Sequence, residues 1–151
     1  MADFRWVPTN SETCTGLRNT ALRAGHENGG STSLYVGRAC YDGTILPAKV
    51  NLDTQKAYVC KDGIEIEVSE FEMYCGSQLI WMRAENGDVP QGAVSVGDSC
   101  GEEAFIGRAR LGPCGEDIII GKILPSQGAC FVPFDGKEEA KTDYEVLVLV
   151  Q

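Results

Sequence analysis

The sequence has few of the side chains on which metal and nucleotide sites depend. Its only histidine is His26, and none of its seven cysteines stands in a Cys-x-x-Cys pair. The close-spaced ligand pairs of a structural zinc site are therefore missing. No Gly-rich loop leads into Lys-Ser or Lys-Thr, the signal for binding nucleotide phosphates. We expect the protein to use no metal and no other cofactor.

Long apolar runs and helical periodicity are also missing. No apolar stretch approaches the length needed to span a bilayer. The first residues, Met1–Trp6, lack the basic segment and apolar core of a signal peptide. We therefore expect a cytoplasmic location, with export by an unconventional route left open. No long segment keeps a period of 3.6 residues, so any helix should be short.

Positive charge is scarce, with 13 Lys and Arg against 22 Asp and Glu and a formal net charge of −9. Binding to nucleic acid or to anionic membranes relies on clustered Lys and Arg, so we expect neither partner. A neutral ligand remains compatible with this charge. The 151 residues are enough to fold around a core without a metal or disulfide.

The cysteines are odd in number, so at least one is unpaired within the chain. They do not recur at equivalent positions in the two halves, which argues against a disulfide framework. We expect most of them to be small buried hydrophobic residues with free thiols. They are Cys14, Cys40, Cys60, Cys75, Cys100, Cys114 and Cys130.

Two copies of one unit make up the chain. Trp6 and Trp81 are 75 residues apart, and the offset between the later equivalent segments rises from 70 to 73 residues, which places a three-residue insertion in the loop Leu111–Gly115. We expect a single domain over residues 1–151, with repeats over residues 6–80 and 81–151. The matching segments are Trp6 and Trp81, Leu34–Ala39 and Ala104–Ala109, Ala48–Val50 and Gly121–Ile123, and Asp62-Gly63 and Asp135-Gly136.

The repeat unit has the pattern of antiparallel strands. Ile64–Val68 alternates apolar and charged residues, and Asp-Gly or Asn-Gly pairs recur as hairpin turns. We predict an all-β fold in which two pseudo-twofold-related antiparallel repeats are intertwined into one compact domain. The strand at Trp6 should lie against Tyr144–Val150, and the strand at Trp81 should serve the first copy in the same way.

Polar residues inside apolar strands are the shared chemical feature of the two halves. Arg38 and Arg108 are interpreted as structural, tying strands together through carboxylates or carbonyls. Lys49 and Lys122 each follow a turn with acidic residues. A lysine beside a carboxylate offers donors and acceptors to the adjacent hydroxyls of a sugar. The alternative is that both are ordinary surface lysines.

One histidine cannot provide a catalytic centre in both halves, and we expect no enzyme activity. His26 beside Glu27 is interpreted as a solvated loop residue.

Several motifs, in order and twice, resemble the DM-nine repeat over nearly the whole chain. The first copy shows Gly25–Gly30, Leu34–Ala39, Asp42-Gly43 and Leu46–Val50, and Asp143–Leu147 resembles the terminal strand. The resemblance implies a small lectin, similar to the invertebrate mannose-specific lectins that act in innate immune pattern recognition. It also implies calcium-independent binding of mannose or high-mannose glycans, and a homodimer.

The same resemblance implies two sugar pockets, each with a lysine and two acidic residues. These are Glu27, Asp42 and Lys49 in one pocket, and Asp98, Asp117 and Lys122 in the other. Two alternatives stay open. The halves could clamp a protein partner without any sugar, or paired carboxylates could act as a glycosidase.

Overall fold

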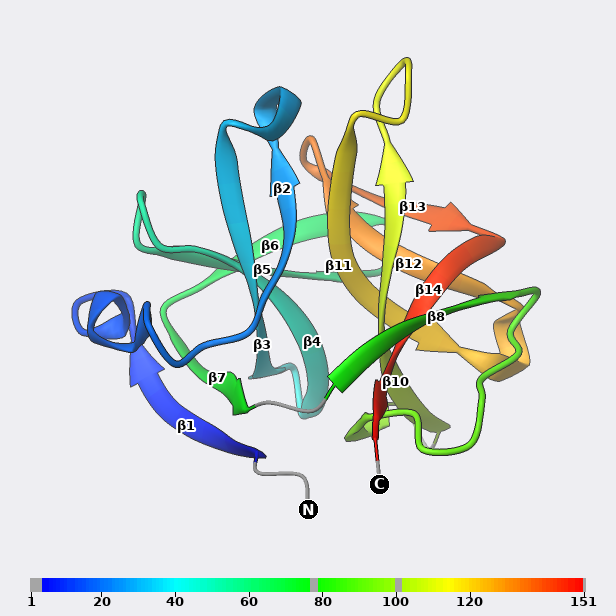
Figure 1. Ribbon diagram of the computed structural model, residues 1–151, viewed down its shortest axis with the longest axis horizontal. Coiled ribbons are helices and arrows are strands. Elements are labelled where there is room, and N and C mark those ends of the chain that lie inside the picture. Colours follow the sequence, from blue (N-terminus) through cyan, green and yellow to red (C-terminus); the bar gives the residue numbers. More distant parts are fainter. Residues whose placement is uncertain (1–3, 77–78, 100–101, 151) are drawn as a thin grey trace.

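The computed structural model describes residues 4–76, 79–99 and 102–150, and this part of the chain is built from strands (Figure 1). It contains no α-helix, and no helix long and apolar enough to cross a membrane. Three short 3-10 turns occur: η1 (Cys14–Leu17), η2 (Asn28–Gly30) and η3 (Pro125–Gln127). The strands of the first repeat are β1 (Phe4–Asn10), β2 (Arg23–Glu27), β3 (Thr32–Tyr41), β4 (Thr44–Asn51), β5 (Lys56–Lys61), β6 (Ile64–Val68) and β7 (Glu70–Gly76). Those of the second are β8 (Leu79–Glu85), β9 (Ser95–Ser99), β10 (Glu102–Leu111), β11 (Asp117–Leu124), β12 (Ala129–Phe134), β13 (Lys137–Lys141) and β14 (Asp143–Leu149).

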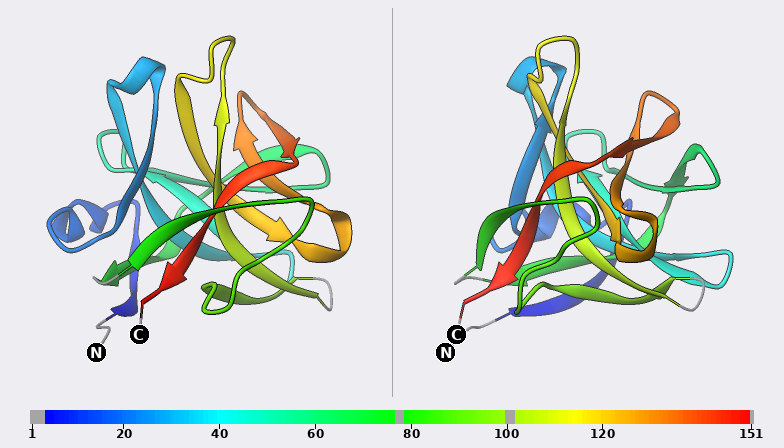
Figure 2. Two further views of the ribbon diagram at one scale, coloured as in Figure 1. Left: turned by 45° about the vertical axis from the view of Figure 1, so that its right-hand side comes forward. Right: turned by 90° about the vertical axis from the view of Figure 1, so that its right-hand side faces the viewer.

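Eight of these strands close into an antiparallel barrel. The pairing runs β2–β3–β4–β5–β6–β13–β12–β11 and returns to β2. The two halves meet at two seams, where His26 of β2 pairs with Ile118 of β11 and Ile64 of β6 pairs with Lys137 of β13. The remaining strands extend the sheet outside the ring: β7 and β1 beside β3, and β10, β9, β14 and β8 beside β11 (Figures 1 and 2). The prediction of intertwined antiparallel repeats is confirmed.

The edge strands follow a different plan from the one predicted. Strand β1 pairs with β7 of its own repeat, with Trp6 opposite Tyr74, and β8 pairs with β14, with Trp81 opposite Leu147. The predicted exchange of these strands between repeats is wrong. Each tryptophan lies under the arginine of its own half, at 4.4 Å for Arg38 and 4.2 Å for Arg108. This cation–π contact attaches each edge strand to its own repeat.

The turns predicted from the sequence form as expected. Asp42, Asp62, Asn86 and Asp135 all have φ between 53° and 56°, and the glycine that follows each also has positive φ. Asp-Gly and Asn-Gly tolerate this left-handed backbone at low cost. The alternation of Ile64–Val68 ends at Ser69, where the chain turns from β6 into β7.

Candidate functional site

Lys49 of β4 lies inside the barrel wall, with its residue only 3% exposed. Its ammonium forms ion pairs with Glu27 of β2 and with Glu65 of β6, the latter at 2.8 Å. It also donates to the carbonyl of Pro133, in the second repeat, at 2.7 Å. An ammonium has three N–H donors, and three partners use all of them. Lys49 is a fully satisfied buried cation.

Lys122 of β11 occupies the equivalent place in the second repeat. Its ammonium pairs with Glu138 at 3.0 Å and donates to the carbonyl of Cys60, in the first repeat, at 2.9 Å. The carboxylates also contact the opposite repeat, because Glu138 accepts a hydrogen bond from the amide of Gly63 at 2.9 Å. Glu65 accepts from the amide of Gly136 at 2.8 Å. Each half therefore supplies backbone partners to the ion pair of the other.

The two lysines differ in one respect. Strand register places Ser99 of β9 where β2 carries Glu27, because Thr32 faces Glu27 and Glu102 faces Ser99. Within the described part of the chain, Lys122 has the two partners given above and therefore one N–H without an acceptor. Among the described residues, Lys122 is thus the lysine that has an N–H available for a ligand.

The structure brings together only some of the predicted site residues. Glu27 and Lys49 are in direct contact. Asp42 instead pairs with Lys61 at 3.4 Å, and its side chain is 76% exposed. Asp117 is buried and accepts from the amide of Gly29 at 3.1 Å, so it holds the turn that follows Glu27 in the other repeat. Asp98 belongs to β9 and pairs with Glu103 of β10, and its side chain lies outside the described part of the structure.

Sequence reasoning missed the carboxylates that complete the two lysine sites. Glu65 and Glu138 are separated by the same 73 residues as Lys49 and Lys122. That shared offset was the available signal. The alternation of Ile64–Val68 instead assigned its glutamates to the solvent face, whereas the Glu65 side chain is 12% exposed.

A cavity of about 510 Å³ opens beside Lys122 and Glu138. It lies between the repeats, because Lys61 and Asp62 come from the end of β5 and its turn, whereas the other lining residues come from the second repeat. Its surface combines one aromatic ring, two ammonium groups, three carboxylates and exposed amide and hydroxyl groups. The lining is Lys61, Asp62, Glu102, Lys122, Leu124, Ser126, Gln127, Phe131 and Glu138.

The arginines have the structural role that the sequence predicted. Arg38 pairs with Glu72 at 2.6 Å and ties β3 to β7. Arg108 pairs with Glu145 at 2.9 Å, ties β10 to β14, and donates to the carbonyl of Ala24 in the first repeat at 2.9 Å. Both are partly buried charge-assisted contacts between neighbouring strands.

Two details bear on catalysis. His26, predicted to be a solvated loop residue, is instead half-buried in β2, and its Nε2 contacts the carbonyl of Glu116 at 2.8 Å. The expectation that the chain has no Gly-x-Ser-x-Gly pattern is wrong, because residues Gly97 to Gly101 spell it. Its described residues belong to β9, an antiparallel strand, whereas a hydrolase elbow joins a strand to a helix.

The described cysteines are all free thiols, as the sequence predicted. Cys40 and Cys114 are exposed, and the other four of the six are buried. Burial raises the pKa of the Cys130 thiol far above its usual range. The pKa of Cys60 is also raised well above its usual value, first by burial and then by the carboxylate of Glu138. Within the described residues, no group of three His, Cys, Asp or Glu side chains is placed to hold a metal ion.

Comparisons with known proteins fit this architecture. A comparison with curated protein sequences gave no match. The fold is similar to the crystal structure of the nematode sperm cell motility protein MFP2B, with a TM-score of 0.69 at 13% sequence identity. The match covers 100% of this chain and 46% of that protein, and at this identity it shows the fold alone. The model of the DM9 repeat matches twice, at residues 28–114 and 98–151. The chain therefore belongs to the DM9 repeat family.

Proposed function

We propose that this protein is a calcium-independent lectin and that the cavity beside Lys122 binds a mannose-type sugar. The observation that carries the proposal is a buried ammonium with one N–H that has no acceptor among the described residues, next to a carboxylate and open to a cavity of about 510 Å³. Ligand sites of this size pair an apolar wall with a few fixed polar groups.

The lining matches the chemistry of a neutral sugar. Lys122 can donate to one hydroxyl while Glu138 or Asp62 accepts from its neighbour. Phe131 provides an apolar surface for the C–H face of the ring. Glu102 is fixed by two hydrogen bonds, from the amide and the hydroxyl of Ser126, both at 2.7 Å. The ammonium of Lys122 supplies the positive charge beside Glu138, the place that a calcium ion takes in calcium-dependent sites.

The equivalent lysine supports one site per chain rather than two. Lys49 gives all three N–H groups to Glu27, Glu65 and Pro133, so a sugar hydroxyl at its ammonium would have to displace a protein partner. We propose that the Lys49 cluster stabilises the fold and that the Lys122 cluster binds.

A single pocket of this kind binds weakly, and pattern recognition on microbial glycans calls for several. We propose a homodimer for this reason, since linked sites gain avidity without any new contact. The edge strand β8 supports it, because Ile80 and Met82 are exposed there at 46% and 40%. We propose recognition of high-mannose glycans in innate immunity as the role of such paired sites.

The test is a titration with methyl α-mannoside followed by NMR, on the wild type and on two matched variants. Asp62 lines the cavity, whereas Asp135 is the equivalent hairpin residue in the other repeat and does not line it. Asp62→Asn should weaken binding about tenfold through the loss of a charged acceptor, because asparagine keeps the positive-φ turn. Asp135→Asn should bind like the wild type.

The same titration with and without a calcium chelator should give equal affinities. No spectral change at millimolar sugar would overturn the proposal, and equal losses in the two variants would overturn the choice of pocket. A chromogenic mannoside should remain intact, and its cleavage would point to a glycosidase instead.

A further inference from the structure

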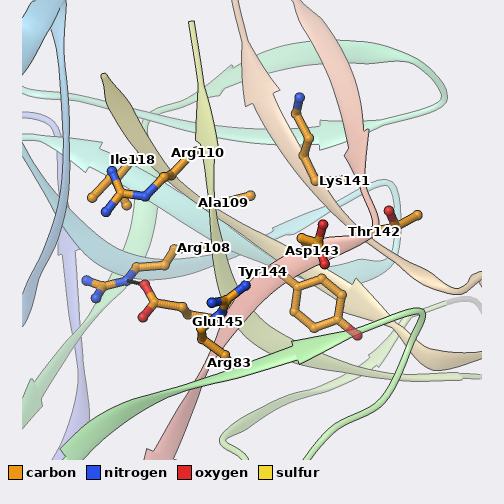
Figure 3. Close-up of a pocket in the computed structure, with 10 residues that line it drawn as sticks. All are labelled: Arg83, Arg108, Ala109, Arg110, Ile118, Lys141, Thr142, Asp143, Tyr144 and Glu145. Carbon is orange, nitrogen blue, oxygen red and sulfur yellow. Dashed lines mark hydrogen bonds and ion pairs between the residues drawn. The ribbon is translucent and has the colours of Figure 1, made fainter. Parts of the chain in front are cut away.

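A second cavity, of about 540 Å³, lies in the second repeat, where β8, β10 and β14 adjoin the barrel strands β11 and β13 (Figure 3). Its charged lining comes from four strands, namely β8, β10, β13 and β14. Four cationic side chains line it against two carboxylates, in a chain whose net charge is −9. The cations are Arg83, Arg108, Arg110 and Lys141, and the carboxylates are Asp143 and Glu145.

One of the four cations is already neutralised. Arg108 pairs with Glu145 at 2.9 Å and stacks on Trp81 at 4.2 Å, as Figure 3 shows for the ion pair. The other three form no ion pair with any residue in the described part of the chain. Arg110 gives one N–H to the carbonyl of Gly115 at 3.3 Å. Three cations therefore face this cavity with Asp143 as the remaining carboxylate of its lining.

Comparison with the first repeat shows which of these charged residues are shared by both repeats and which occur only in the second. The set of Arg108, Glu145 and Trp81 recurs in the first repeat as Arg38, Glu72 and Trp6. The three unneutralised cations do not recur. The register of the equivalent strands places Pro8, Cys40 and Val68 at the positions of Arg83, Arg110 and Lys141. The repeat folds without charge at these positions, so folding does not require these cations.

The register also puts the three arginines on one face of the sheet. Glu145 lies opposite Arg108 on one side and opposite Arg83 on the other, so the two arginines flank it across adjacent strands. Their Cα atoms are roughly 10 Å apart, twice the spacing of paired strands. Arg110 follows two residues after Arg108 and shares its face. Arg83 and Arg110 therefore stand on the two strands that flank β14, and their guanidinium groups can approach one small ligand from two sides.

We propose that this cavity binds the phosphate or sulfate group of a small, sugar-sized ligand. Arg83 and Arg110 would bind the oxyanion with their planar N–H pairs, and Lys141 would add a third positive charge. The Arg108–Glu145 pair holds these strands together beneath the ligand. The inference rests on a different cavity from that of the proposed mannose site, and either can fail without the other.

The test is a set of titrations at low ionic strength, followed by NMR, with five probes. The probes are inorganic phosphate, inorganic sulfate, glucose 6-phosphate, glucose 6-sulfate and glucose. The first four should shift the amide signals of β8, β10 and β14, and glucose should not shift them. Binding of only the phosphates, or only the sulfates, identifies the anion source. Added salt should weaken each interaction, because screening acts on partly exposed charges.

Two variants and one control locate the site. Arg83→Gln and Arg110→Gln should each weaken glucose 6-phosphate binding about tenfold, because each removes charge-assisted hydrogen bonds. Arg5→Gln makes the same change at an exposed arginine on the edge strand β1 of the other repeat, and should have no effect. Lack of binding by all four anionic probes, or equal losses in the three variants, would overturn the proposal.

Discussion

At the scale of single residues, two lysines in equivalent positions have different surroundings. Lys49 balances two carboxylates and a carbonyl, whereas Lys122 balances one carboxylate and a carbonyl. Removal of a buried ion's partner is costly because it leaves an uncompensated charge. Lys49 should therefore contribute more to the free energy of unfolding than Lys122 does.

Lys49→Met should lower the free energy of unfolding by about 3–5 kcal/mol, since Glu27 and Glu65 lose their counter-ion. Lys122→Met should cost less, because only Glu138 is left unpaired. Urea denaturation measures both. Lys56→Met is the control, since Lys56 forms a half-exposed pair at 3.9 Å and should change stability by less than about 1 kcal/mol. Equal costs for Lys49→Met and Lys56→Met would contradict this reading.

The sequence was sufficient to find the lysines and insufficient to assign their partners. Repetition and their place inside apolar strands identified Lys49 and Lys122, and the family resemblance placed Glu27 in one pocket with Lys49, with which it forms an ion pair. Asp42 was chosen for its position before the strand, but the hairpin directs it to Lys61 at the surface. Glu65 lies on β6, two strands from Lys49 in the series β4–β5–β6, and a contact across an intervening strand is a property of tertiary structure.

At the scale of elements, strands and turns follow from the sequence, whereas pairing partners do not. Alternation and Asp-Gly pairs gave the hairpins, because both are local signals. The predicted pairing partner of the Trp6 strand was wrong because it assumed that the repeats exchange their edge strands, whereas they exchange an inner strand. The exchange occurs at β2, which crosses to β11, and the sequence marks this place only by Gly25.

Gly25 permits that crossing by lacking a side chain. A Cβ atom at this position would lie 2.3 Å from the carbonyl oxygen of Ile118, a backbone atom that cannot rotate away. Gly25→Ala should therefore push β2 from β11 and destabilise the fold by roughly 1–3 kcal/mol in urea denaturation. Gly16→Ala, where a Cβ would meet nothing within 4 Å, should be nearly neutral. If both changes are neutral, the close contact between β2 and β11 does not contribute to the free energy of unfolding.

At the scale of the whole molecule, the two repeats complete each other. Barrel closure joins them at two seams, and the Lys49 and Lys122 clusters take carbonyl partners from Pro133 and Cys60 of the opposite half. An isolated half would expose two sheet edges and leave these polar groups without partners, which is costly for buried groups. We therefore expect the repeat to be a structural unit but not a folding unit.

Expression of residues 1–78 and 79–151 as separate chains tests this interdependence. Each half alone should show poorly dispersed amide signals and no cooperative unfolding, because its apolar face and its buried lysine lack their cover. Mixing the two should restore a dispersed spectrum and a one-to-one complex in sedimentation. A half that instead folds as a dimer of itself would still support the pseudo-twofold exchange, since a second copy supplies the missing seam. A half that is folded and monomeric would show that a repeat can fold without barrel closure, and would contradict the expected interdependence of the two repeats.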